Sequence, residues 1–216
     1  MDESGIHDGA KVCVISGYFG GKGHMKKLQR GWHSVLDDFD FPMADFHAKD
    51  LLKQDKFRPL LIALAKEIAK QQKAHPVSYG IIVDDFNSFT LEERRFMTGA
   101  TFSPKTGELL STGCPSKPYF VPFQNIVKLV CDYAPVGGKA HFNFGLDRKF
   151  SEYARELFEQ ISTQSQLQPR PWSTWNSVDR LGSPHFPLAK ETPELQAADL
   201  LVHLTYQHIL RWLEHG

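Results

Sequence analysis

Three aspartates lie at positions where a sheet-containing protein can assemble a metal centre. Asp2 lies near the start of the chain, Asp147 follows a strand-like segment at 139–144, and Asp199 lies in the apolar stretch 195–201. Hard divalent cations prefer carboxylate oxygens from separate elements as ligands. Two such ions, roughly 3.5–4 Å apart, activate a water molecule and stabilise the leaving oxygen in phosphodiester hydrolysis. These residue types therefore indicate metal-dependent phosphodiester chemistry.

Asp199 is the most unusual of the three, because it interrupts an otherwise apolar stretch. A buried carboxylate there is costly unless it faces a polar site. The alternative is a solvent-facing Asp199, with Gln196 and His203 on the same helix face at the i−3 and i+4 positions. The residue pattern leaves both interpretations open.

Apolar periodicity predicts alternating strands and helices around these acids. A first strand around Asp2 is expected to pair antiparallel with the second strand, across a turn at Asp8 and Gly9. The order predicts a mixed α/β fold, with a five-stranded sheet and helices on both faces. Segment 85–119, rich in Gly, Pro, Ser and Thr, is expected to be a loop-rich insertion within one domain, 1–216. The other expected strands are 11–19, 77–83, 139–144 and 172–178, and the expected helices are 24–39, 58–73 (closed by Pro76), 120–133, 148–164 and 195–212.

Composition is that of an ordinary globular domain, with 41% hydrophobic and 23% charged residues among 216. No apolar run approaches the roughly 20 residues of a membrane-spanning helix, and from the acidic start we expect no signal peptide. We therefore expect a cytoplasmic protein with reduced cysteines and no membrane partner. The 25 basic and 25 acidic residues argue against a protein that simply coats nucleic acid. They do not exclude a nuclease, whose acidic metal site offsets basic residues elsewhere.

The glycine-rich segment 17–24 does not fit a phosphate-binding P-loop, because the spacing of its glycines is wrong. It is expected to be a strand-to-helix turn. Four nearby cations form a modest basic patch able to touch phosphates: Lys22, Lys26, Lys27 and Arg30.

Four segments of the chain resemble a known protein family. They are DESGIHDGAKVCVISGYFGG at the start, DFHAKDL at 45–51, HFNFGLDRKFSEYARELF at 141–158 and PELQAADLL at 193–201. They resemble the domain-of-unknown-function family 3800, which occurs in bacteria and their phages and is assigned to the ribonuclease-H-like superfamily. The resemblance spans essentially the whole chain and implies a ribonuclease-H-like fold.

The resemblance also implies a role for each candidate residue. Asp2 corresponds to the aspartate of the central first strand, Asp147 to the acid after the fourth core strand, and Asp199 to the aspartate of the final helix. Glu3 matches the next family residue, although strand alternation is expected to turn it to the other face. His47 matches a family histidine that accompanies the acids.

The function implied by the resemblance is a metal-dependent phosphodiester hydrolase, a nuclease acting on RNA or DNA with Mg²⁺ or Mn²⁺. Asp2, Asp147 and Asp199 are expected to bind the metal, and Glu3 and His47 are expected to assist catalysis. The alternatives are a catalytically inactive interaction module of a phage-defence or mobile-element system, and a phosphoesterase for small molecules. One departure is that only Met1 precedes DESG, where family members have a short apolar run. Either the start codon is assigned too late, or the first strand is shortened and a free amino group lies beside Asp2.

Overall fold

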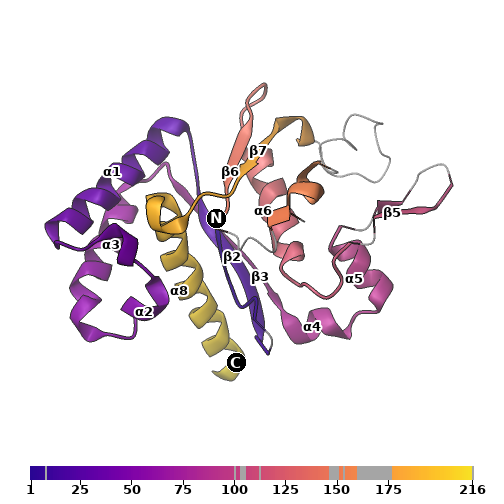
Figure 1. Cartoon of the computed structure of the whole chain (residues 1–216), viewed down its shortest axis with the longest axis horizontal. Coiled ribbons are helices and arrows are strands. Elements are labelled where there is room, and N and C mark those ends of the chain that lie inside the picture. The colour runs from indigo at the N-terminus through magenta and orange to yellow at the C-terminus, as the bar shows by residue number, and fades with distance from the viewer. Residues whose placement is uncertain are drawn as a thin grey trace.

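The computed structural model describes residues 1–7, 9–99, 101–102, 106–111, 113–145, 151–152, 154–159 and 177–215. Its elements alternate along the chain as expected for a mixed α/β protein (Figure 1). The helices are α1 (Lys22–Asp38), α2 (Ala48–Leu51), α3 (Arg58–Lys70), α4 (Val83–Ser88), α5 (Leu91–Met97), α6 (Phe120–Tyr133) and α8 (Pro193–His215). The strands are β1 (Asp2–Ser4), β2 (Val12–Phe19), β3 (His75–Ile82), β4 (Thr101–Phe102), β5 (Leu109–Ser111), β6 (Ala140–Asn143) and β7 (Leu181–His185).

The strands β1, β2 and β3 form an antiparallel sheet with β2 in the middle. Asp2 of β1 lies opposite Ser16 of β2, and Val14 of β2 lies opposite Gly80 of β3. The early antiparallel hairpin predicted from the sequence is therefore confirmed. A separate pair, β6 and β7, runs parallel.

Two backbone hydrogen bonds connect β1 with the end of β6. The Met1 nitrogen donates to the Asn143 carbonyl at 2.8 Å, and the Gly145 nitrogen donates to the Met1 carbonyl at 2.9 Å. Bonds that alternate in this way are the pattern of neighbouring parallel strands. The strands therefore follow one another in space in the order β3, β2, β1, β6, β7, with β1 at the centre (Figure 1).

The two faces of β2 pack against different helices. Cys13 and Ile15 belong to a buried apolar cluster that includes Phe123 of α6. Val14 packs instead with Val202 of α8. Because successive side chains of a strand point to opposite faces, α6 covers one face of the sheet and α8 covers the other (Figure 1). Helices on both faces were expected, and the structure confirms this.

Helix α1 packs against α8, and α3 packs against α1, on the α8 side of the sheet. Trp32, Leu64 and Leu200 are buried in the cluster that joins these three helices. The apolar periodicity that predicted the helices supplies these contacts, because residues three and four apart lie on one helix face. No helix in the described part of the chain combines the length and apolarity needed to span a membrane.

The last strand differs from the prediction. Residues 172–176 of the expected strand lie outside the described residues, and Val178 begins a short 3₁₀ helix instead. The strand that pairs with β6 is β7, whose sequence LGSPH has little intrinsic strand preference. Pairing with β6 decides its conformation, because strand propensity depends strongly on tertiary context.

The position of Pro76 also differs from the prediction. We expected it to close the helix at 58–73, but α3 ends at Lys70 and Pro76 lies within β3, opposite Tyr18. Strand β3 is at the edge of its sheet. Proline is tolerated in an edge strand because its missing N–H removes no bond of the inner ladder.

Segment 85–119 contains more regular structure than the expected loops. It includes α5 and the β4–β5 hairpin, which projects from the rest of the molecule in Figure 1. Helix α5 begins with a capping box, in which the Thr90 hydroxyl accepts from the Glu93 nitrogen and the Glu93 carboxylate accepts from the Thr90 nitrogen. This start signal is visible in the sequence. Of the helix expected at 148–164, residues 151–152 and 154–159 are helical and the remainder lies outside the described residues.

Candidate functional site

Asp2 lies on the central strand and faces α8. Its pairing partner Ser16 and the neighbouring Val14 lie on the same face of the sheet, since paired residues point to the same side. The chain leaving β6 passes directly against the Asp2 carboxylate. A β-carbon added to Gly145 would lie 2.5 Å from Asp2 Oδ1, so only glycine leaves this carboxylate in place.

Asp199 lies in the second turn of α8, between the buried residues Ala198 and Leu200. Its Oδ2 atom accepts a hydrogen bond of 2.8 Å from the backbone nitrogen of Ala48, at the start of α2. This bond fixes the carboxylate between α8 and α2. The interpretation in which Asp199 faces open solvent is therefore wrong, because the side chain is partly buried and bonded to a neighbouring element.

The structure brings Asp2 and Asp199 together from opposite ends of the chain. Burial, together with the nearby charge of Asp199, raises the pKa of Asp2 to about 7. Burial also raises the pKa of Asp199, against the opposing effects of the Ala48 N–H and of His47 and His203. Two carboxylates that share a poorly hydrated space disfavour each other's ionised form. A cation placed between them removes this repulsion.

Two histidines border this acidic pair. His47 lies immediately before α2, and its exposed ring has Nδ1 at 3.4 Å from Asp50 Oδ2. His203 lies one turn after Asp199 on α8, and burial lowers its pKa while the Asp199 charge opposes that change. The predicted residue His47 therefore lies near Asp199, as expected. His203 was assigned only to the solvent-facing alternative, although its i+4 spacing from Asp199 already placed it on the same helix face.

Glu3 does not join Asp2 and Asp199. It pairs with Ile15, whose side chain belongs to the α6 cluster on the opposite face of the sheet. The Glu3 charge accordingly contributes to raising the pKa of Cys13 and Tyr119 on that face, where burial is the main cause. The period-two alternation of a strand produces this separation, as the sequence predicted.

Asp147, the third metal ligand expected from the resemblance, lies outside the described residues. It follows Gly145 by two positions in the sequence. Among the residues that the structure describes, no group of three or more His, Cys, Asp or Glu side chains is arranged to hold a metal ion. Of the three aspartates expected to bind metal, the structure thus describes Asp2 and Asp199, which it brings together.

A buried polar chain holds α8 in position one turn before Asp199. The Trp32 indole Nε1 donates to Gln196 Oε1 at 2.9 Å, and Gln196 Nε2 donates to the Met43 carbonyl at 2.7 Å. Gln29 also donates to Glu194 Oε1 at 2.6 Å. These bonds connect α1 to α8 and satisfy polar groups that are costly to bury alone. They fix the position of the first turns of α8, and therefore the position of Asp199.

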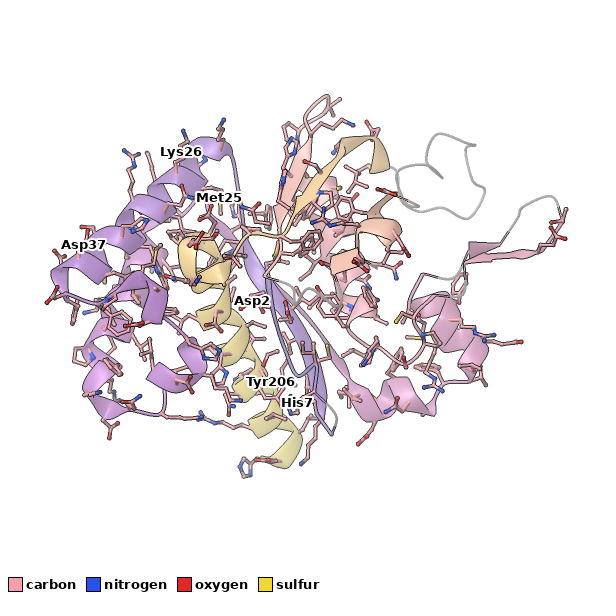
Figure 2. The ribbon with its side chains drawn as sticks, in the orientation of Figure 1. Asp2, His7, Met25, Lys26, Asp37 and Tyr206 are labelled. Carbon is pink, nitrogen blue, oxygen red and sulfur yellow. The ribbon has the colours of Figure 1, made fainter. Side chains whose placement is uncertain are left out.

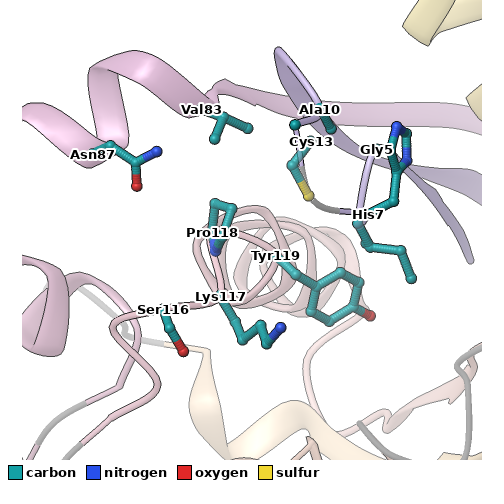
Figure 3. Close-up of a pocket in the computed structure, with 12 residues that line it drawn as sticks. Gly5, His7, Ala10, Cys13, Val83, Asn87, Ser116, Lys117, Pro118 and Tyr119 are labelled. Carbon is teal, nitrogen blue, oxygen red and sulfur yellow. The ribbon is translucent and has the colours of Figure 1, made fainter.

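A cavity of about 180 Å³ lies away from the acidic pair and is lined by Cys13, Lys117 and Tyr119 (Figure 3). Cys13 is fully buried and is a free thiol. Burial raises its pKa to about 12, which leaves the thiol protonated. Since the thiolate is the nucleophilic form, Cys13 is not suited to covalent catalysis.

Comparison with protein-family models, with curated proteins and with solved structures finds no match to this chain.

Substitution of Gly145 tests its close approach to Asp2. The added methyl group of Gly145→Ala forces the Asp2 carboxylate to move, and we expect Mn²⁺ affinity to fall about tenfold, as for other changes that misplace metal ligands. Isothermal titration calorimetry measures this affinity. Gly23→Ala is the matched control, because a β-carbon there meets nothing within 4 Å. Equal affinities for the two variants would contradict the expectation.

The raised pKa of Asp2 predicts a pH-dependent stability in the presence of a chelator. The unfolded value is 3.8 and the folded value is about 7, so the folded protein binds this proton more tightly. Stability therefore falls as the pH rises through this window, and the loss is complete above it. Asp2→Asn removes the loss. We expect its melting temperature to match that of the wild type at pH 4 and to exceed it by about 5 °C at pH 8.

Differential scanning calorimetry in EDTA at both pH values measures the effect. The control is Asp37→Asn, which changes an exposed aspartate on α1 (Figure 2). Its melting temperature is expected to differ from that of the wild type by the same small amount at both pH values. An Asp2→Asn difference that does not vary with pH would contradict the assignment of a raised pKa.

Proposed function

We propose that this chain is a metal-dependent phosphodiester hydrolase, a nuclease of the ribonuclease-H-like kind that uses Mg²⁺ or Mn²⁺. The observation that carries the proposal is the partly buried pair of carboxylates from Asp2 and Asp199, whose pKa values are both raised. A protein gains nothing in stability from two such carboxylates unless a cation joins them, because each raises the cost of ionising the other. Oxygen ligands of this kind select hard divalent ions.

The order of the strands supports the proposal. The ribonuclease-H-like fold implied by the resemblance has a central first strand, an early antiparallel hairpin and a mixed sheet. Here β1 lies between the antiparallel strands β2 and β3 and the parallel strands β6 and β7. Asp2 lies on that central strand and Asp199 on the final helix, and Asp147 follows β6 in the sequence. These are the three positions that the resemblance assigns to metal ligands.

Each residue then has a definite role. Asp2 and Asp199, with Asp147, would hold the divalent ion, and the Ala48 N–H fixes the position of the Asp199 carboxylate. The ion supplies activation of a water molecule and stabilisation of the leaving oxygen. His203 and His47 border Asp199, and an imidazole ring can accept a proton at one nitrogen and donate one from the other. Glu3, on the far face of the sheet, contributes no ligand in this proposal.

Two measurements test the proposal. Purified protein is incubated with end-labelled RNA and DNA in Mn²⁺ and in EDTA, and cleavage is expected only with the metal. Mn²⁺ is also expected to raise the melting temperature by about 5–10 °C at a concentration 100-fold above its dissociation constant. Metal binding without cleavage of either polymer, but with hydrolysis of a small phosphodiester, would favour the small-molecule phosphoesterase. A protein that neither binds the ion nor cleaves would be the inactive interaction module.

A further inference from the structure

A groove of about 990 Å³ runs between the start of α1, the adjoining ends of β2 and β3, and the region where α6 leads into β6. We name it the basic groove. Its volume is at the upper end of the range of ligand sites. The mechanism proposed above uses none of the residues that line it. The basic groove is lined by Met1, Tyr18, Phe19, Gly20, Gly21, Lys22, His24, Met25, Lys73, His75, Val130, Tyr133, Ala134, Pro135, Gly138, Lys139, Ala140, His141, Phe142, Asn143 and Glu194.

The charge of the groove departs from the neutral balance of the whole chain. Its lysines, Lys22, Lys73 and Lys139, come from three separate segments of the chain, and its one acid among the lining residues is Glu194. Lys139 also donates a hydrogen bond of 2.6 Å to the Asp179 carbonyl. Glu194 Oε1 already accepts a hydrogen bond from Gln29. Three histidines also line the groove. An excess of cations gathered along one depression attracts a polyanion, because phosphate neutralisation supplies most of the affinity for nucleic acids.

An aromatic group lies on the wall of the groove. The Phe19 ring centroid is 5.3 Å from that of Tyr133 and 5.4 Å from that of His75. Tyr133 is nevertheless 71% exposed, so much of its surface remains open to solvent in a cavity lined by lysines. Aromatic side chains interleaved with cations are the combination that binds single strands, since each unpaired base has a face to stack. Bases in a duplex are already stacked on each other and do not reach such a ring.

The basic groove and the acidic pair share two segments of the chain. Its lining residue Met1 directly precedes Asp2, and the Met1 nitrogen bonds the Asn143 carbonyl within the groove. Glu194 lies on α8, five positions before Asp199. Figure 2 shows Met25, which lines the groove, at the start of α1, and Asp2 near the middle of the molecule. The groove and the acidic pair are thus built from the same two segments of the chain, although neither carboxylate lines the groove.

We infer that the basic groove binds single-stranded nucleic acid, with backbone phosphates on Lys22, Lys73 and Lys139 and an unpaired base on Tyr133. The inference builds on the proposed function and narrows its substrate to a single strand. Binding itself needs no metal. It can therefore be measured in EDTA, independently of cleavage.

Fluorescence anisotropy with labelled 20-residue oligo(U) and oligo(dT), in EDTA, tests the inference. Tyr133→Ala is expected to weaken binding about tenfold. Phe96→Ala is the matched control, because Phe96 is also 71% exposed but does not line the groove. Replacing Lys22, Lys73 and Lys139 with alanine is expected to reduce the slope of log K against log salt by about 2, the value for three phosphate contacts on a single strand. The control triple variant replaces the exposed residues Lys11, Lys66 and Lys190.

Binding of either oligonucleotide with these dependences supports the inference, and a preference between them identifies RNA or DNA. The inference would be overturned if the protein bound neither oligonucleotide, or if the control variants lost as much affinity as the groove variants. Equally tight binding of a duplex or of polyglutamate would also overturn it. If binding holds while Mn²⁺-dependent cleavage is absent, the proposed hydrolase fails and the groove assignment stands. If cleavage is unaffected by the groove variants, the groove assignment fails and the proposed hydrolase stands.

Discussion

Asp199→Asn is expected to reduce Mn²⁺-dependent cleavage about 10³-fold or more, because a metal ligand contributes several kcal/mol to stabilising the transition state. The amide has the shape of the carboxylate, and its oxygen can still accept the 2.8 Å hydrogen bond from the Ala48 nitrogen. It carries no charge and is a poorer ligand for a hard cation. The substitution therefore separates the chemistry of Asp199 from its structural contact with α2.

Initial rates on a labelled single strand, measured with the wild type and the variant at equal Mn²⁺, check this result. Removal of a partly buried charge is expected to leave the melting temperature in EDTA unchanged or higher, since burial raises the Asp199 pKa. Asp37→Asn, on the exposed face of α1 (Figure 2), is expected to keep the full rate. A variant at Asp199 that retains more than a tenth of the activity would remove the carboxylate pair from the mechanism.

Trp32→Ala is expected to destabilise the protein by about 3–5 kcal/mol, the range for large aromatic side chains lost from a core. Trp32 is 0% exposed and packs edge-on against Phe46, with ring centroids 5.1 Å apart. Its indole also donates to Gln196, so the substitution leaves a buried amide oxygen without this partner. Because Gln196 precedes Asp199 by one turn, the loss is also expected to weaken Mn²⁺ binding.

Urea denaturation followed by circular dichroism measures the free energy of unfolding. Trp212→Ala is the matched control, because Trp212 is 60% exposed near the end of α8 and exposed substitutions usually change stability by less than about 0.5 kcal/mol. Similar losses in the two variants would contradict the role of Trp32 in joining α1 to α8.

The sequence by itself determined the long helices and the strand β2. Apolar residues at helical spacing predicted 120–133, and α6 spans Phe120–Tyr133. The same periodicity located α1, α3 and α8 to within a few residues, because an amphipathic face has to be buried whatever its partner. Asp199 also stood out, since a carboxylate among Leu195, Ala197, Ala198 and Leu200 requires a polar neighbour.

Only the tertiary structure decided what Asp199 faces. Its pairing with Asp2 depends on the packing of α8 against β1 and β2, and its bond to Ala48 depends on α2; neither contact has a local signature. Contacts between distant segments also decide the strand β7 and the basic groove. Gly182, Ser183 and Pro184 become a strand because β6 offers a parallel partner, and lysines far apart in the sequence share a groove because three segments of the chain converge. Local patterns record which face of an element is buried, whereas contacts between distant segments follow from how those faces pack together.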